Sequence, residues 1–429
     1  MRRASRRRCS VCARIPSGAA GAPPLDRAQF PILERRVGRD GDRPLVYLDS
    51  AATSLVPLRV TDALTAFLHT SCANIHRGAH TLAEEATDAY ERSREHLAAF
   101  LHVDDPARLL FTHGATESLN LAARCWAEEA LAPGDVVAVA EDNHHANIVC
   151  WQMLAARRGL EIAWIPLQAD GMLDYGAWCR IAERGPKLVA LAQQSNVIGW
   201  EQPALAAILA DASRSGVVVA LDGAQAAGHR PVDLGEMPAD FYAVSAHKML
   251  GVTGVGALAC SSRVLERMRP ALGGGGMVER VDRAGFVPAA APQGFEPGTP
   301  AIAAAMAWDA ALAMLEEAGM AALERHVGAL ASRAQRGLSA MAGVQVVGGA
   351  QRASGSLVGF AVADVHPHDV SALLDARGVL VRAGHHCARP LHAALGFPAS
   401  VRASFAGYST DEDVDALLSA VERIVEEGV

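Results

Sequence analysis

The stretch that decides the fold is Phe241-Tyr242-Ala243-Val244-Ser245-Ala246-His247-Lys248, because a short apolar run ends here in a hydroxyl, an imidazole and an amine. Gly251, Gly254 and Gly256 follow closely, which is typical of the end of a buried strand. A lysine in this place is most often a solvated surface charge. It is also the residue that forms a Schiff base when its amine is partly desolvated. The rest of the chain has to decide between these two interpretations.

The composition is that of a large globular protein. The chain has 429 residues, of which 51% are hydrophobic and 20% charged, and this length predicts two or three domains. The net charge of -8 argues against a general nucleic-acid or anionic-membrane binder. No apolar run approaches the roughly 18 residues of a membrane-spanning helix. We therefore expect no nucleic-acid and no membrane partner.

The cysteines are scattered through the sequence, at positions 9, 12, 72, 125, 150, 179, 260 and 387. This is not a disulfide framework, so we expect reduced thiols and a cytoplasmic protein. Cys9 and Cys12 form one C-x-x-C pair, but no second pair completes a zinc site, and no metal centre is expected. The first 24 residues are Arg-rich without acidic residues, which leaves open a targeting peptide, a disordered tail or an upstream start codon.

Short apolar runs alternate with helical patterns in the middle of the chain. The runs cover residues 109–111, 136–140, 162–165, 188–192, 217–221, 241–244 and 255–259. Most are continuously apolar, as strands covered on both faces are. Their alternation with helices predicts a mostly parallel sheet with right-handed crossovers, so the expected fold class is α/β.

The regions on either side predict further elements and a second domain. Residues 81–101 repeat apolar side chains at helical spacing, and the Gly- and Pro-rich residues 273–300 predict a long loop or hairpin. A helical stretch over residues 301–341 is broken near Gly319. Residues 45–48 predict a short strand. A smaller α+β domain is predicted by strand patterns at residues 344–347, 357–362, 379–381 and 401–405 and by helix patterns at residues 370–376 and 411–427.

Ligands bind at the C-terminal ends of the strands of an open parallel sheet, so the residues after each run are candidates. Ala115 and Thr116 open a helix, where free N–H groups suit a phosphate, although an ordinary helix cap is equally compatible. His144 either stacks on a flat ring or is a satisfied histidine. Asn196 follows the run at residues 188–192. Asp222 comes directly after the run at residues 217–221, where its poorly solvated carboxylate needs a partner.

Each of these features is weak alone, but their joint placement is informative. With Ser245, His247 and Lys248 they supply a phosphate seat, a ring-stacking imidazole, an amide, an acid and an amine. Pyridoxal phosphate requires such a set. Neither a G-x-G-x-x-G after an early strand nor a Walker A loop is found, so a dinucleotide or P-loop site is not indicated.

Eight motifs carry a family resemblance. They are Tyr-Leu-Asp-Ser-Ala-Ala (47–52), His-Arg-Gly (76–78), His-His-Ala-Asn-Ile-Val (144–149), Ser-Asn-Val (195–197), Asp-Gly-Ala-Gln (222–225), His-Lys (247–248), Gly-Thr-Pro (298–300) and Arg-Ala-Gly-His-His-Cys-Ala (382–388). With them the chain, from about Leu25 onward, resembles the fold-type I pyridoxal-phosphate enzymes of aminotransferase class V. Within these it is similar to the group II cysteine desulfurases of the SufS and CsdA type.

We expect four parts of the chain. Residues 1–24, which have no counterpart in the family pattern, are a disordered extension. The resemblance implies the other three, of which residues 25–50 join the small domain. Residues 51–305 form the large pyridoxal-phosphate-binding domain. Residues 306–429 form the small domain that carries a catalytic cysteine loop.

The resemblance also implies how the cofactor is held. Lys248 binds the aldehyde and later moves protons, Asp222 pairs with the pyridinium nitrogen, Gln225 bonds the ring hydroxyl, and His144 stacks on the ring. The phosphate is held by Ala115, Thr116, Ser245 and His247, with Thr299 reaching in from the other subunit of a homodimer.

For the substrate, L-cysteine, the resemblance implies that Arg402 binds the carboxylate and that Asn196 and Arg382 lie near it. Cys387 attacks the substrate sulfur and holds it as a persulfide, leaving L-alanine. A SufE-like or SufU-like acceptor then receives the sulfur, and iron–sulfur cluster assembly is the expected destination. The residues themselves support Cys387, because it lies in a glycine-containing loop among histidines and arginines, a basic setting that favours the thiolate.

Several alternatives stay open. A selenocysteine lyase or cysteine sulfinate desulfinase would share nearly every residue, whereas an aminotransferase or kynureninase-like enzyme would not need Cys387. A non-catalytic scaffold would lack Lys248 or Cys387. His366-Pro367-His368-Asp369 resembles a motif of members that use a SufU-like acceptor, but a surface turn before a helix explains it equally well. Ala246 and Asn143 depart from the family pattern without removing a reactive group.

Overall fold

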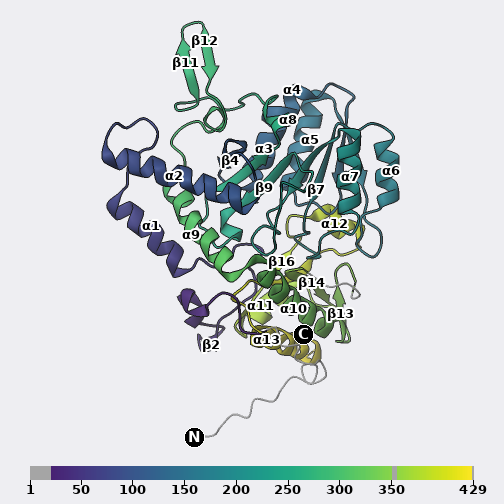
Figure 1. The fold of residues 1–429 in the computed structure, drawn as a ribbon. Coiled ribbons are helices and arrows are strands. Elements are labelled where there is room, and N and C mark those ends of the chain that lie inside the picture. The colour runs from purple at the N-terminus through teal and green to yellow at the C-terminus, as the bar shows by residue number, and fades with distance from the viewer. Residues whose placement is uncertain (1–20, 350–354, 428–429) are drawn as a thin grey trace.

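The computed structural model describes residues 21–349 and 355–427, in which a large sheet with its helices lies beside a smaller sheet (Figure 1). Most of the predicted N-terminal extension and the Cys9–Cys12 pair lie outside the described residues. Folded structure begins at Leu25, which is buried and donates its N–H to the carbonyl of Gly407 at 3.1 Å.

The large sheet has seven strands in the order β4-β10-β9-β8-β7-β5-β6. Their bounds are β4 Leu109–Thr112, β5 Val136–Ala140, β6 Glu161–Ile165, β7 Leu188–Ala192, β8 Val218–Asp222, β9 Phe241–Ser245 and β10 Gly256–Cys260. The pairs among β5 to β9 are parallel, so the predicted mostly parallel α/β sheet is confirmed. β10 runs antiparallel to both β9 and β4, because the short return from β9 leaves no room for a crossover helix.

Both faces of this sheet are buried, which explains the continuously apolar runs. Alternate residues of one strand enter different cores: Val137 and Val139 lie in one, whereas Val136, Ala138 and Ala140 lie in the other. One face carries α1 Leu58–Thr70, α2 Thr81–Phe100, α6 Tyr175–Ala182, α7 Leu205–Ser215 and α9 Ile302–Ala318. The other carries α3 Ala115–Leu121, its continuation through residues 122–127 and α4 Glu128–Ala130, and α5 Ala146–Arg158.

The smaller sheet is antiparallel, with the order β13-β14-β17-β16. Its strands are β13 Val344–Val346, β14 Leu357–Val362, β16 Arg382–Gly384 and β17 Ser400–Ser404, and its core is shared with α10 Met320–Ser339, α11 Pro367–Asp375 and α13 Asp411–Glu427. The predicted helix break is confirmed, because Gly319 separates α9 from α10 with a φ of 78°. The run at residues 379–381 forms β15 Val379–Leu380, which ends before β16 begins and pairs in parallel with β3 Val46–Tyr47.

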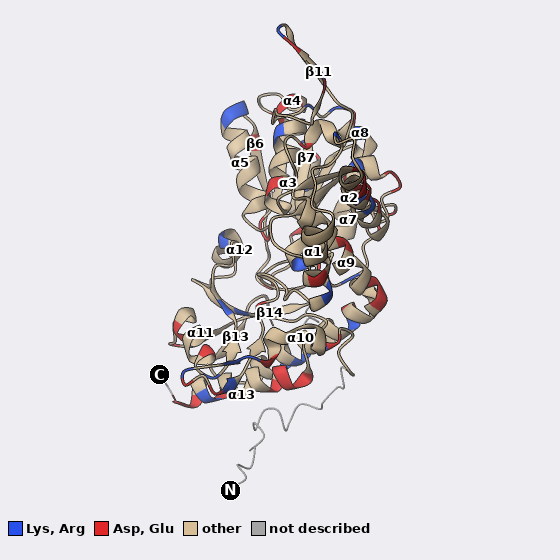
Figure 2. Cartoon of the chain, turned by 90° about the vertical axis from the view of Figure 1, so that its left-hand side faces the viewer, with Lys and Arg blue, Asp and Glu red and all other residues tan. Residues whose placement is uncertain are grey.

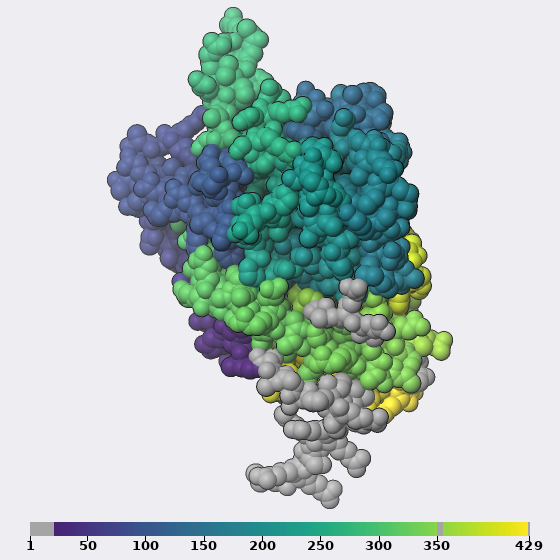
Figure 3. Space-filling model, turned by 45° about the vertical axis from the view of Figure 1, so that its right-hand side comes forward, coloured from purple at the N-terminus to yellow at the C-terminus, as the bar shows by residue number. Residues whose placement is uncertain are grey.

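The glycine-rich stretch contains the predicted hairpin, β11 Val278–Asp282 and β12 Gly285–Pro288. It stands out from the body of the molecule (Figures 1 and 3), and Val281 and Phe286 on it are 67% and 56% exposed. The sequence patterns missed α1, which buries few residues, and several short elements. The short elements are β1 Arg36–Val37, β2 Arg43–Pro44, α8 Ser262–Leu265, α12 Arg389–Ala394 and the 3-10 turns at Arg27–Gln29, Pro31–Glu34, Pro106–Arg108, Ala246–Lys248 and Gln293–Phe295.

Acidic and basic positions are both distributed along the ribbon in Figure 2. Within residues 21–349 and 355–427, no helix is long and apolar enough to cross a membrane. The same residues contain no group of three or more His, Cys, Asp or Glu side chains that could hold a metal ion.

Candidate active site

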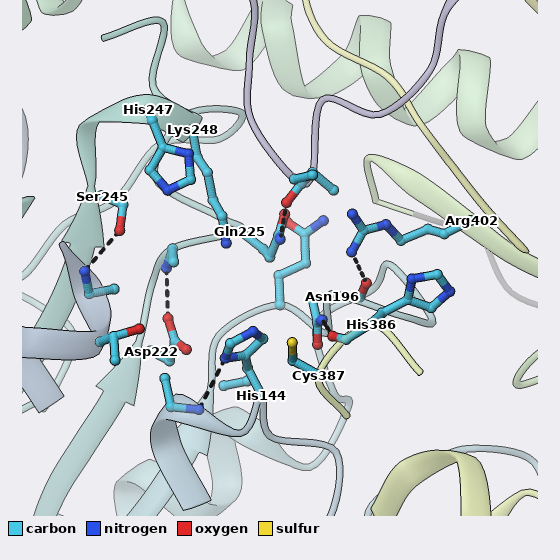
Figure 4. A pocket seen from close by; sticks show the side chains of 18 of the residues that line it. His144, Asn196, Asp222, Gln225, Ser245, His247, Lys248, His386, Cys387 and Arg402 are labelled. Carbon is cyan, nitrogen blue, oxygen red and sulfur yellow. Dashed lines mark hydrogen bonds between the residues drawn. The ribbon is translucent and has the colours of Figure 1, made fainter. Parts of the chain in front are cut away.

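A cavity at the C-terminal ends of the parallel strands collects the predicted site residues (Figure 4). It encloses about 800 Å³ of space including its open mouth. Residues from the large sheet and its loops, with Ala51 and Ala52, line one side, and residues of β16, β17 and the loop after β16 line the other. All the predicted residues except Thr299 line it: Ala115, Thr116, His144, Asn196, Asp222, Gln225, Ser245, His247, Lys248, Arg382, Cys387 and Arg402.

Lys248 ends a 3-10 turn that directly follows β9. Burial lowers the pKa of its ammonium from 10.5 to about 8; Asp222 opposes this shift, and Arg402 and Arg382 add to it. An amine with a pKa near 8 is partly neutral at ordinary pH and is therefore able to attack a carbonyl carbon. The interpretation of Lys248 as a solvated surface charge is wrong.

Asp222 is the last residue of β8 and is buried. Burial raises the pKa of its carboxyl group, against the opposing effects of Lys248 and of the Ala224 N–H, which donates to Oδ1 at 3.0 Å. A buried carboxylate with a backbone donor on one oxygen is stabilised further by a cation. A protonated ring nitrogen in the cavity would supply that cation.

The N-terminus of α3 lies against the end of β9 and forms one end of the cavity. The Ala115 N–H donates to Ser245 Oγ at 2.8 Å. Gly256 permits this close approach, because a Cβ there would lie 2.4 Å from the Gly114 Cα. His247 faces the same cavity, and burial followed by Lys248 lowers its pKa to about 4, so its imidazole is neutral.

Five buried polar atoms of residues that line the cavity lack a hydrogen-bond partner among the described residues. They are Gln225 Oε1, His247 Nδ1, Asn196 Oδ1, His386 Nδ1 and Arg402 Nε. An unsatisfied buried polar group costs roughly 1–3 kcal/mol, so five around one cavity indicate a site built for a polar ligand. Gln225 is held by its Nε2, which donates to the Ala51 carbonyl at 2.9 Å, and Oε1 is left to accept from a hydroxyl.

His144 lies between β5 and α5, and its ring lines the cavity. Its Nδ1 accepts from the Ala146 N–H at 3.1 Å. Burial, and then the charge of Lys248, lowers its pKa to about 3. The ring is therefore neutral and fixed in orientation, which suits stacking on a flat ligand.

Two arginines lie side by side on paired strands at the end of the cavity that faces away from the N-terminus of α3. Arg382 of β16 is the register partner of Arg402 of β17. Arg402 is 2% exposed and donates to the Asn196 carbonyl at 3.0 Å and to Asp49 Oδ1 at 3.3 Å. Burial lowers its pKa to about 10, against the opposing effect of Asp49. A buried guanidinium with a free Nε beside a second arginine suits a carboxylate ligand.

Cys387 is exposed at the mouth of this cavity, and Figure 4 shows its sulfur near His144 and Asn196. His386 and Cys387 are consecutive non-glycine residues with left-handed backbone, at φ values of 49° and 55°. Such a conformation costs of the order of 1–3 kcal/mol per residue and persists only where the surroundings impose it. The Asn196 side chain contributes, since its Nδ2 donates to the His386 carbonyl at 2.5 Å.

Thr299 is exposed and lies outside this cavity. It lines a different cavity together with Asn74, His76 and Arg77, which belong to the His-Arg-Gly motif region. This position within one chain is compatible with the expectation that Thr299 serves the site of a second subunit.

Comparison with known proteins gives the family. The family model described as aminotransferase class-V matches residues 46–417. The chain belongs to this family. A probable cysteine desulfurase of Halobacterium salinarum is 43% identical over 398 residues, covering 92% of this chain and 95% of that protein.

Solved structures of class-V relatives agree with the fold and the resemblance. The cysteine desulfurase CsdA of Escherichia coli, in an S-sulfonic acid form, is 40% identical with a TM-score of 0.84, covering 94% of this chain and 98% of that chain. The apo cysteine desulfurase of Thermococcus onnurineus is 33% identical with a TM-score of 0.87, covering 96% and 98%. The predicted resemblance to cysteine desulfurases of aminotransferase class V is confirmed.

Some residues of this class-V site escaped the sequence analysis. Gln194 and His386 line the cavity, although neither was predicted as a site residue. Burial, with Arg402 nearby, keeps the pKa of His386 well below its usual range. Gln194 lies just after the end of β7, so it could have been predicted from the rule that ligands bind at the ends of parallel strands. The only signal for His386 in the sequence was its position next to Cys387.

Proposed function

We propose that this protein is a pyridoxal-phosphate-dependent cysteine desulfurase, which converts L-cysteine to L-alanine and holds the sulfur as a persulfide on Cys387. One observation carries the proposal: Lys248, with a lowered pKa, and the exposed thiol of Cys387 line the same cavity. A Schiff-base lysine alone is compatible with any class-V activity. A thiol that reaches the same cavity adds a nucleophile for sulfur.

The residues fit the cofactor through the unsatisfied atoms of Gln225 and His247 and the buried carboxylate of Asp222. Lys248 would hold it covalently, and Ala115, Thr116 and Ser245 would hold its phosphate. When bound, pyridoxal phosphate supplies an electron sink that acidifies the α-proton of an amino acid. Arg402 and Arg382 would orient the substrate carboxylate.

The protein groups then perform two tasks. The Lys248 amine, once free, takes the α-proton and later returns a proton to carbon. The Cys387 thiolate attacks the substrate sulfur, so that an S–S bond forms while the Cβ–S bond breaks. The electron pair of the broken bond stays on the substrate carbon, which takes up a proton and leaves as alanine. The persulfide remains on an exposed side chain, where an acceptor can reach it.

The decisive experiment compares Cys387→Ala with the wild type. We expect the variant to retain the visible absorption of the bound cofactor and to lose alanine formation from cysteine by roughly 10³-fold, the scale of a lost catalytic group. Cys72→Ala is the matched control, because Cys72 is also exposed but lies outside the cavity. Alanine is measured with and without a thiol acceptor, and undiminished alanine formation by Cys387→Ala contradicts the proposal.

Selenocysteine lyase and cysteine sulfinate desulfinase are the alternative activities, because the same arginines and lysine would bind those substrates. A sulfinate group departs without attack by a thiolate, so Cys387→Ala should spare alanine formation from cysteine sulfinate while abolishing it from cysteine. Comparison of kcat/KM for the three substrates ranks the activities.

The exposure of Cys387 supports a protein partner that receives the sulfur, either SufE-like or SufU-like, within cytoplasmic iron–sulfur cluster assembly. His366 and His368 are exposed and stack with their ring centroids 5.4 Å apart. His366 also caps α11, since its Nδ1 accepts from the His368 N–H at 3.3 Å, so a purely structural role has equal support. Alanine formation with each acceptor in turn distinguishes the two partner classes.

The position of Thr299 supports a homodimer in which each subunit completes the phosphate site of the other. The segment that carries Thr299 is fixed in place, because Glu296 accepts from the buried Arg94 at 2.7 Å and from the Phe111 N–H at 2.6 Å. A rigid segment that presents an exposed threonine suits a contact between subunits. Sedimentation measures the oligomeric state, and a monomeric active enzyme contradicts this part of the proposal.

A further inference from the structure

The loop of Cys387 is held on both sides by one histidine that was not predicted as a site residue. The backbone N–H of His145 donates to the Cys387 carbonyl at 2.7 Å. The Nε2 of the same residue accepts from the Arg389 N–H at 3.1 Å. His145 therefore contacts the main chain at Cys387 itself and two residues beyond it.

His145 is a suitable anchor because its own turn is fixed to the central sheet. The buried Asn143 donates from Nδ2 to the Ala190 carbonyl of β7 at 2.9 Å, and the buried Asn147 donates to the Leu191 carbonyl at 2.9 Å. Trp151 Nε1 donates to Asn147 Oδ1 at 2.9 Å and so fixes the Asn147 side chain. The turn that carries His145 is therefore held by the large sheet, and His145 in turn holds the Cys387 loop, which follows β16 of the smaller sheet.

The contacts explain how a strained backbone persists at an exposed loop. Residues 386 and 387 are both left-handed, and their neighbours must impose this conformation. Asn196 fixes the His386 carbonyl, whereas His145 fixes the Cys387 carbonyl and the Arg389 N–H. The imidazole must accept at Nε2 and is therefore neutral, which agrees with a pKa lowered by burial, His385 and Arg389.

We propose that His145 is a positioning residue for the nucleophile: its two hydrogen bonds hold the Cys387 loop in the left-handed conformation that directs the thiol into the cavity. This inference rests on the proposed role of Cys387. His144, its neighbour, acts differently, because its ring lines the cavity whereas the His145 ring contacts the loop.

The test compares His145→Gln with His145→Asn in the full-length, cofactor-loaded enzyme. A Gln amide oxygen reaches the position of Nε2, whereas an Asn side chain is too short, so the pair differs chiefly in the bond to Arg389. We expect kcat for persulfide formation on Cys387 to fall about tenfold in His145→Asn and to stay within about threefold of the wild type in His145→Gln. KM and the visible cofactor spectrum should be unchanged in both.

A second measurement does not depend on turnover. Hydrogen exchange of the peptide that spans residues 385–389 should accelerate in His145→Asn, because the Arg389 N–H loses its acceptor, and should remain slow in His145→Gln.

The inference is overturned by equal kcat in the two variants, by a loss of kcat that follows a loss of cofactor absorption, or by exchange that is the same in both. If the wild type forms no persulfide on Cys387, it is the proposed function that fails. Unchanged exchange with normal persulfide formation would count against His145 alone.

Discussion

The two sides of the cavity are built in opposite ways. The cofactor side consists of residues at the ends of buried strands, such as Asp222 and Ser245, whose backbones belong to the sheet. The nucleophile side is a loop with an exposed cysteine and two consecutive left-handed residues. The first side gains its geometry from the core, whereas the second gains it from a few hydrogen bonds across the cavity.

This difference shows how one cavity can both retain a bound cofactor and release sulfur to an acceptor. A group that stays bound through many turnovers is best held by rigid, buried residues, which alter pKa values through desolvation. A sulfur atom that must leave for an acceptor needs an exposed carrier. Cys387 is exposed and yet oriented, because His145 and Asn196 connect its loop to the rigid side.

The largest expected effect tests the buried side. Lys248→Ala should lose alanine formation by roughly 10⁴-fold and lose the visible absorption of the covalently held cofactor, because no other amine lines the described cavity. Lys187→Ala is the matched control, since Lys187 is exposed outside the cavity and should behave as the wild type. Equal loss in both variants would remove the distinction between the two lysines.

A smaller effect is expected where the two sides meet. Arg402→Gln should raise KM for cysteine roughly tenfold to a hundredfold, because a charge-assisted hydrogen bond to a carboxylate contributes about 1.5–3 kcal/mol. The cofactor spectrum should persist. Arg157→Gln, on the exposed surface of α5, should leave KM unchanged. An unaltered KM in Arg402→Gln would place the substrate carboxylate elsewhere.

The smallest effect is a shift in pH dependence. The rate at which cofactor-free protein combines with pyridoxal phosphate should rise with pH and reach half its maximum near pH 8, because burial lowers the pKa of Lys248 to about 8 and only the neutral amine reacts. Asp222 raises this pKa, so Asp222→Asn should move the midpoint to lower pH. A midpoint near the ordinary lysine value of 10.5 would contradict the buried environment.

The sequence was most informative for the large sheet. Strands buried on both faces give continuous apolar runs, so their existence and their polar ends were predictable, and Asp222 and Lys248 followed from them. The antiparallel direction of β10 was not predictable, because an apolar run has the same appearance in either direction. α1 was missed, since few of its residues, Val60 and Phe67 among them, are buried.

What the sequence by itself determined was the order of the strands along the chain, the chemistry at their ends, and the family resemblance that singled out Cys387. Only the tertiary structure decided that Cys387 shares a cavity with Lys248, that Arg382 pairs with Arg402, and that Thr299 lies outside this cavity. The role of His145 was also hidden, because its contacts with Cys387 and Arg389 join segments that are distant in the chain. Such contacts depend on how two sheets pack, and no local pattern records that packing.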